Sequence, residues 1–247
     1  MKIKKLHDAY GAEILAHHEG RESYEIIERE GGFIDLSSGP LNYFSDYPKW
    51  PGFEKKAIRF ARGRVLDVGS GAGRVSLYLQ KKGCQVTAID NSPLALKVCR
   101  ERGVKRTLCL PFEGIGKFRG NSFDTVVMYG NNFGLFGGFK KARRLLRTLF
   151  RITSPDSRII AVSMDPYATK DPVHLAYHRF NRRRGRMGGQ IRIRVRFRNY
   201  TGPWFDYLFV SRREMKSILE GTGWKVEKII GSGGFPYVAV IGKTVKV

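Results

Sequence analysis

The chain has 247 residues, which suits one domain of ordinary or large size with a substantial core, and it lacks the run of about eighteen apolar residues that a membrane-spanning helix needs. Its 45 lysines and arginines against 22 acidic residues give a formal charge of +23 and a pI near 10.2. Because one sign dominates, the ion-pair networks of a heat-stable protein do not explain the composition, and an anionic partner is favoured.

The first sixty residues are expected to form a cap and not a domain of their own. Short helical patterns run from Asp8 to His18 and from Ser23 to Glu30. An aromatic, turn-rich stretch, SSGPLNYFSDYPKWPGF, follows over residues 37–53. The sequence predicts a boundary near residue 60, with residues 1–60 lying over the domain that follows.

A regular alternation of strands and helices begins after Gly63. β-Branched and apolar runs alternate with helical patterns that carry N-cap residues and closing glycines. The expected strands are 64–69, 85–90, 104–110, 123–130 and 157–164, and the expected helices are 71–83, 92–103 and 139–152. A helix over 211–224, with Ser211 and Glu214 as a capping box, and strands at 225–231 and 237–243 complete the chain. This order predicts an α/β, Rossmann-like, doubly wound and mostly parallel seven-stranded sheet over residues 61–247.

A basic insert interrupts this pattern at about residues 165–209, after the fifth strand. It has no acidic residue between Asp171 and Asp206, and it contains the stretch GQIRIRVRFRN at 189–199. In a strand these apolar and arginine residues point to opposite faces, so a row of arginines is expected on one face. A charged edge strand explains such a row, but arginine forks also suit phosphate oxygens. We therefore expect RNA contacts from Arg182, Arg183, Arg184, Arg186, Arg192, Arg194, Arg196, Arg198, Tyr200 and Trp204, extended by Lys2, Lys4 and Lys5.

Cysteine and histidine spacing gives no metal signature. Cys84, Cys99 and Cys109 lack a C-x-x-C spacing, and the N-terminus does not resemble a secretory signal, so we expect buried thiols in a cytoplasmic protein. His174 and His178 share a helix face without a third nearby ligand. We expect no metal.

The most specific motif is VLDVGSGAG, over residues 65–73, which ends one strand and opens a helix. Glycines permit a tight turn and close approach of a ligand, while the following helix offers free N–H groups. It has neither the G-x-G-x-x-G spacing of dinucleotide sites nor the Gly-Lys-Ser/Thr of a P-loop. Asp67 precedes the glycines, and Asp90 ends the next strand, where a carboxylate can hold both hydroxyls of a ribose.

In these residues the chain resembles the class I S-adenosylmethionine-dependent methyltransferases, over about residues 60–163 and the last helix and strands. The resemblance implies S-adenosyl-L-methionine as cofactor and S-adenosyl-L-homocysteine as product. It implies that the amino-acid part of the cofactor is held by Asp67, Gly69, Ser70, Gly71 and Gly73, and the ribose by Asp90 with Asn91. After the third strand the chain runs into CLPFE, at 109–113, which departs from the family's pattern and leaves the adenine contact unassigned.

The acceptor side of the site is expected at YGNNFG, residues 129–134, after the fourth strand. It resembles the motif of amino-methyltransferases acting on nucleic acids, without their two prolines, and also the Gly-Asn-x-Phe of small-amine N-methyltransferases. Asn131 or Asn132 would accept a hydrogen bond from an amine, with Phe133 stacking on it or walling the pocket and Tyr129 beside it. The alternative is an asparagine turn that satisfies its own backbone.

Together these features predict an RNA methyltransferase that methylates an exocyclic base amine, such as N4 of cytosine, in ribosomal RNA or a ribosomal subunit, without a membrane partner. The alternative is a small-molecule amine N-methyltransferase in which the insert forms a lid over the pocket. A non-catalytic binding protein is disfavoured, because the glycine motif and Asp90 are both intact.

Overall fold

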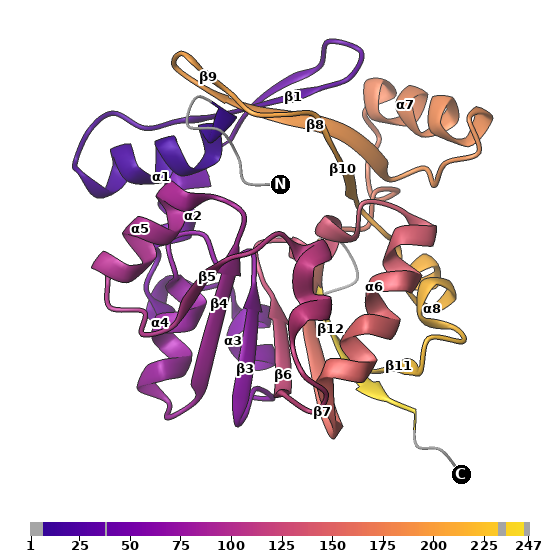
Figure 1. Ribbon diagram of the computed structural model, residues 1–247. Helices are drawn as coiled ribbons and strands as arrows, with labels where there is room; N and C mark the ends of the chain where they lie inside the picture. The colour runs from indigo at the N-terminus through magenta and orange to yellow at the C-terminus, as the bar shows by residue number, and fades with distance from the viewer. Residues whose placement is uncertain (1–6, 38, 232–235, 245–247) are drawn as a thin grey trace. The chain divides into compact units, whose positions relative to one another are not determined.

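The computed structural model describes residues 7–37, 39–231 and 236–244, which form two compact units (Figure 1). The first unit takes its residues from 1–50, 62–115 and 192–205, and the second from 51–61, 116–191 and 206–247. Lys2, Lys4 and Lys5 lie outside the described residues. No helix within those described ranges is both long and apolar enough to cross a lipid bilayer.

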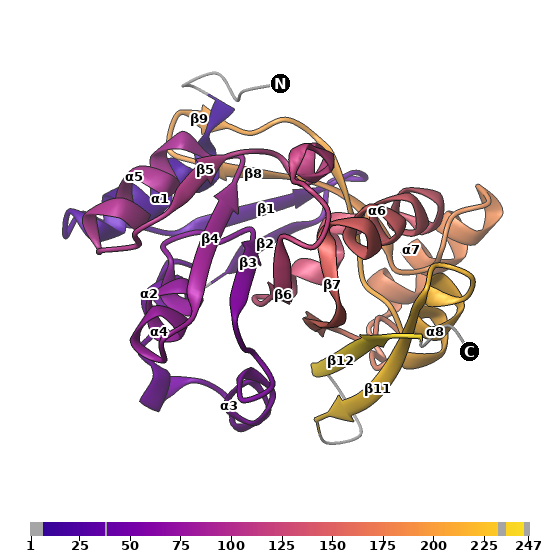
Figure 2. The ribbon, with the colours of Figure 1, turned by 60° about the horizontal axis from the view of Figure 1, so that its bottom comes forward.

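The predicted α/β fold is confirmed. The larger sheet has seven strands in the order β11-β12-β7-β6-β3-β4-β5. Within the first unit, β3 (Arg64–Val68), β4 (Gln85–Asp90) and β5 (Thr107–Cys109) are parallel neighbours, joined through α4 (Arg74–Lys81) and α5 (Pro93–Glu101). Figure 2 shows β3 and β4 side by side, with α4 and α5 on the same side as β4. The third predicted strand, 104–110, is shorter in the structure.

The second unit contains β6 (Phe123–Met128) and β7 (Thr153–Ser163), which are parallel neighbours. β12 (Tyr237–Lys243) runs antiparallel to β7, and β11 (Trp224–Ile230) runs antiparallel to β12. The helices of this unit are α3 (Gly52–Ile58), α6 (Phe139–Ile152), α7 (Pro172–Arg183) and α8 (Arg212–Leu219). The predicted capping box of Ser211 and Glu214 opens α8. Short 3₁₀ helices occur at Asn132–Phe136 here, and at Tyr47–Lys49 and Phe112–Lys117.

The cap consists of α1 (Ala9–His18), β1 (Glu25–Arg29), β2 (Ile34–Ser37) and α2 (Gly39–Phe44). The helix predicted over Ser23–Glu30 is wrong, because this segment forms β1. Gly31 and Gly32 adopt φ of +91° and +86° and close a hairpin, in which Glu25 pairs with Ser37 and Glu28 with Ile34. Long-range pairing to β8 (Gln190–Phe197), antiparallel to β1, decides the conformation against the local helical pattern.

The arginine stretch forms the predicted strand, but β8 lies inside a sheet. Its neighbours are β1 on one side and the short β9 (Tyr200–Thr201), and the sheet order is β10-β8-β1-β2, with β10 at Phe205–Leu208. Val195 and Phe197 are buried against alanines of α1 at positions 9, 12 and 16. The apolar face of β8 therefore packs on the cap helix, and the arginines face the opposite side.

Candidate active site

The glycine motif forms a tight turn between β3 and α4. Gly69, Gly71 and Gly73 have φ of +69°, +53° and +81°, which other residues rarely adopt. The backbone N–H groups of Gly69 and Ser70 donate to the carbonyl oxygen of Ile89, at 2.9 and 3.1 Å, and so join the turn to β4. These bonds hold the turn at the carboxyl ends of two parallel strands, the usual ligand site of such sheets.

Side chains at the second and third glycines would collide with the structure around them. A Cβ atom at Gly73 would lie 2.8 Å from both Sγ of Cys99 and Cγ2 of Val104. At Gly71 it would lie 3.2 Å from the hydroxyl oxygen of Tyr10, on the cap helix α1. Glycine at both positions therefore serves close packing as well as backbone conformation, and the approach to Gly71 is set by Tyr10.

Asp67, near the end of β3, is buried and accepts a hydrogen bond from the hydroxyl of Ser76 at 2.6 Å. Burial raises the pKa of its carboxyl group to about 6, against the opposing effect of that hydrogen bond. Because Ser76 lies on α4, Asp67 ties the strand to the helix that the glycine turn opens. Its predicted contact with the cofactor's amino-acid part remains a prediction.

Asp90 ends β4 with both carboxylate oxygens turned to backbone donors. Its Oδ2 accepts from the N–H of Gly71 at 3.0 Å and its Oδ1 from the N–H of Ser92 at 2.9 Å. Burial raises its pKa to about 6, while these two N–H groups lower it. A carboxylate offers about four acceptor positions, so the group can still accept from a ribose hydroxyl. The glycine turn and Asp90 thus fit S-adenosylmethionine. Asn91 is exposed, and its contact with the ribose stays a prediction.

The cap helix is attached beside Asp90 by a residue that the sequence analysis did not single out. Asp8, the N-cap of α1, accepts from the N–H of Gly11 at 3.0 Å and from the hydroxyl of Ser92 at 2.9 Å. It also accepts from the N–H of Leu94, at 3.2 Å, in the first turn of α5. One carboxylate therefore caps two helices. In the sequence, an aspartate before a helical pattern predicts an N-cap for α1. It gives no sign of the contact with α5, whose N-cap residue Ser92 lies 84 residues later.

The acceptor segment lies in the second unit, after β6. Asn131 has a left-handed backbone, with φ of +65°, and its carbonyl oxygen accepts from the hydroxyl of Tyr207 at 2.7 Å. Its side-chain oxygen Oδ1 is buried and has no hydrogen-bond partner among the described residues. The Tyr207 ring packs against Gly134, where a Cβ atom would lie 2.2 Å from it. Asn131 therefore presents an acceptor that its own backbone turn does not satisfy.

Two other predicted acceptor residues have structural roles. Phe133 is fully buried, with its ring centre 4.9 Å from that of Phe136, so it is a core ring in this structure, and its role in stacking on a substrate or walling the pocket stays a prediction. Tyr129 is also buried and donates its hydroxyl to the carbonyl of Glu54 at 3.1 Å, which makes it a support for α3. Asn132 starts the 3₁₀ helix, and its backbone N–H donates to the carbonyl of Tyr129 at 3.2 Å.

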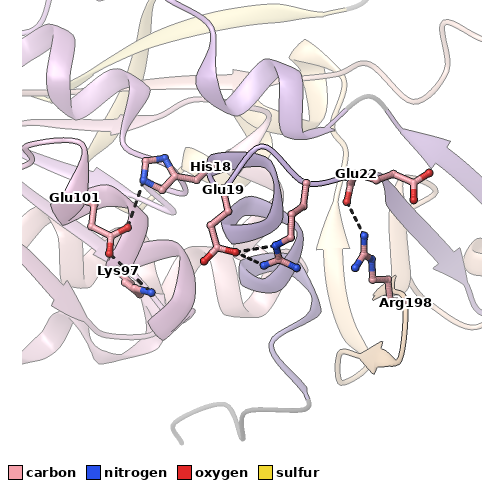
Figure 3. Close-up of polar contacts among 7 residues, drawn as sticks. His18, Glu19, Glu22, Lys97, Glu101 and Arg198 are labelled. Atoms are coloured by element: carbon pink, nitrogen blue, oxygen red, sulfur yellow. Dashed lines mark hydrogen bonds and ion pairs between the residues drawn. The ribbon is translucent and has the colours of Figure 1, made fainter.

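The predicted RNA-binding residues fall into the two units. Arg194 and Arg196 pair with Glu28 of β1, at 2.9 and 3.4 Å, and Arg194 also lies over the Trp204 ring. Arg198 donates to the backbone carbonyl of Glu22 (Figure 3). The basic row is thus partly neutralised by an acid from the cap. Arg192 and Tyr200 share this unit, and Arg182, Arg183, Arg184 and Arg186 lie in the other unit.

Three of the predicted RNA-binding arginines in the second unit lie against an aromatic ring or an acid. Arg182 lies over the ring of Tyr167 and Arg184 over that of Phe180, while Arg186 is 4.0 Å from Asp206.

The described residues include no cluster of three or more His, Cys, Asp or Glu suited to a metal ion. Of the cysteines, Cys99 is buried as expected, Cys84 is half-buried and Cys109 is exposed, so the prediction of three buried thiols is wrong for the last.

Parts of the chain are similar to known methyltransferases. Residues 66–161 match the family described as "Methyltransferase domain". Over 75 residues the chain is 38% identical to a ubiquinone biosynthesis O-methyltransferase of Xanthomonas oryzae, covering 28% of this chain and 31% of that protein. A putative methyltransferase of Geobacillus is 24% identical over 121 residues, 46% of this chain and 49% of that protein. The chain thus spans about a third to a half of these curated relatives.

A solved structure matches nearly the whole chain. A methyltransferase of Bacteroides fragilis dependent on S-adenosylmethionine, in complex with S-adenosyl-L-homocysteine, superposes with a TM-score of 0.83 and 25% identity, covering 99% of this chain and 98% of that one. The chain therefore has the class I methyltransferase fold, and the match to the methyltransferase domain family lies within it.

Proposed function

With this domain as the starting point, we propose that the chain is an enzyme that transfers the methyl group of S-adenosylmethionine to a nitrogen atom of a small molecule. The observation that carries the proposal is the side-chain oxygen of Asn131, which is buried and without a hydrogen-bond partner in the described part of the chain. A buried amide oxygen left without a donor is unfavourable by about 1–3 kcal/mol. A substrate N–H supplies that donor.

The chemistry of nitrogen methylation fits this acceptor. The cofactor supplies a methyl group on a sulfonium, so that a carbon–sulfur bond breaks as the carbon–nitrogen bond forms, and one N–H proton leaves to solvent. Asn131 would accept that N–H and thereby orient the nitrogen lone pair. Tyr207 donates to the backbone carbonyl of Asn131 and packs on Gly134, and so holds the backbone from which the Asn131 side chain extends.

The placement of the arginine row supports a small substrate. The opposite, apolar face of β8 packs on α1, and α1 also contacts the glycine turn, through Ile14 against Ala72. The arginines thus lie on the side of the sheet away from α1, and two of them already pair with Glu28. A relative named for ubiquinone biosynthesis also favours a small molecule, although its name specifies oxygen as the acceptor atom.

RNA remains the second candidate, as a base-amine methyltransferase acting on ribosomal RNA. Its support is the net charge of +23 and the exposed arginines at the end of α7, namely Arg179, Arg182, Arg183 and Arg184. If about six phosphates were bound, RNA affinity would fall roughly a thousandfold between 50 and 200 mM salt. Filter binding of ribosomal RNA over this salt range separates the two candidates, because a small-molecule enzyme gives a weak, unsaturable signal.

The acceptor assignment is tested by Asn131→Gly, which removes the amide and keeps the left-handed backbone without strain. We expect methyl transfer to fall at least a hundredfold in extract assays while S-adenosyl-L-homocysteine affinity stays within twofold. Asn121→Gly is the matched control, since Asn121 is exposed and has φ of +55°. Full activity in Asn131→Gly would remove the amine acceptor.

A further inference from the structure

The cap contains two adjacent buried carboxyl groups that the methyl-transfer site described above does not use. Glu13 of α1 is fully buried and Glu25 of β1 is 3% exposed. Glu25 accepts from the hydroxyls of Ser37 and, at 2.9 Å, Tyr43. Glu13 finds no such donor: neither of its oxygens has a hydroxyl, amide or cationic partner among the described residues. Its interaction is with Glu25, another acid.

Among the described residues, no ion pair joins either acid to a lysine or an arginine. The chain carries 45 lysines and arginines, yet the influences that raise the pKa of Glu13 to about 11 are burial first and then Glu25. With its pKa raised in this way, the carboxyl group of Glu13 holds a proton at neutral pH. Two buried carboxyl groups can be accommodated with one proton, but ionising both is unfavourable unless a positive charge joins them. A cation that can donate several hydrogen bonds has the chemistry to bind such a pair.

Two tyrosines connect the pair to the glycine turn. The rings of Tyr10 and Tyr43 are 5.2 Å apart, and the Tyr43 hydroxyl donates to Glu25. The Tyr10 hydroxyl lies 3.2 Å from the Cβ position of Gly71. The pKa of Tyr10 is raised first by burial and then by Asp90, Glu25 and Glu13. Its hydroxyl is therefore within electrostatic range of all three acids. Carboxylates beside aromatic faces are a favourable environment for an ammonium ion.

We propose that Glu13 and Glu25, with Tyr10 and Tyr43, form a binding site for an ammonium group. That group is either the α-ammonium of the cofactor's amino-acid part or the protonated amine of a substrate; only the second source rests on the proposed function. On binding, the neutral carboxyl of Glu13 becomes a carboxylate paired with the ammonium, and its proton is released to solvent.

Calorimetry with S-adenosyl-L-homocysteine and 5′-methylthioadenosine tests the first source, because the second compound lacks the amino-acid part. For Glu13→Gln we expect a loss of roughly tenfold to a hundredfold in S-adenosyl-L-homocysteine affinity and less than twofold for 5′-methylthioadenosine. Titrations in phosphate and Tris buffer at pH 7.5 should show nearly one proton released by the unmodified chain and none by Glu13→Gln. Glu22→Gln, an exposed acid of the same cap, is the control.

The second source is tested on protein saturated with S-adenosyl-L-homocysteine, titrated with n-butylammonium chloride and with n-butanol. Binding of the ammonium but not the alcohol, lost in Glu13→Gln, supports a substrate ammonium. Tyr43→Phe, which keeps the ring, should weaken whichever ligand binds by a smaller factor. If neither probe distinguishes Glu13→Gln from Glu22→Gln, and no proton is released, the proposal is overturned. These binding readouts stay informative even if Asn131→Gly refutes methylation at nitrogen.

Discussion

Replacing Asp90 with asparagine tests the description of its buried carboxylate. Burial raises the pKa of Asp90 from 3.8 to about 6, so the folded chain binds this proton more tightly than the unfolded chain. The resulting stability is fully present below about pH 4 and is lost as pH rises through about 6. In total the shift corresponds to about 3 kcal/mol, and between pH 5 and pH 8 about 1.4 kcal/mol of it is lost.

Asparagine carries no charge, so Asp90→Asn should be free of this loss. We expect its free energy of unfolding, relative to the unmodified chain, to be about 1.4 kcal/mol more favourable at pH 8 than at pH 5, whatever the offset from altered hydrogen bonds. Urea unfolding without cofactor at both pH values measures this difference. Asp35→Asn, an exposed acid on β2, is the control. A relative stability that is the same at both pH values would refute the assignment of a raised pKa to Asp90.

Three further predictions concern the supports of the site. Ser76→Ala removes the donor to buried Asp67 and should lower the free energy of unfolding by about 1–3 kcal/mol at pH 8, measured by urea unfolding; an unchanged midpoint would contradict the bond. Gly71→Ala places a Cβ atom 3.2 Å from the Tyr10 hydroxyl, at a position with a left-handed backbone. It should weaken the binding of S-adenosyl-L-homocysteine more than tenfold, as measured by calorimetry. Gly83→Ala, at a left-handed glycine with nothing within 4 Å, should leave this binding unchanged. Phe133→Ala removes a buried core ring and should lower the free energy of unfolding by about 3–5 kcal/mol, measured by thermal or urea unfolding. A variant that is stable but inactive would instead indicate that Phe133 stacks on the substrate.

The sequence predicts the glycine turn and Asp90 well because these features are local. A strand end, left-handed glycines and an acid on the next strand are each specified by a few consecutive residues, and parallel pairing of β3 and β4 brings them together. The same holds for the strand at the arginine stretch, whose alternation of residues matches the period of a strand.

The features that the sequence did not predict depend on distant partners. Residues 25–29 become a strand because β8, more than 160 residues later, pairs with them. The same pairing sets Glu28 opposite Arg194 and changes the meaning of the arginine row. In the sequence, Asp8 and Glu13 fit an ordinary helical pattern. Their roles depend on the contact of Asp8 with α5 and of Glu13 with Glu25 of β1, which a local pattern does not specify. Burial of Phe133 follows from packing against Phe136, which no motif specifies.

The most direct test of the proposed function follows the methyl group itself. Purified protein is incubated with S-adenosylmethionine labelled in its methyl group and with an extract separated into small molecules and RNA, beside Asn131→Gly. We expect label on nitrogen in the small-molecule fraction, and we expect it to depend on Asn131. Label confined to RNA, or on oxygen or carbon of a small molecule, would contradict it.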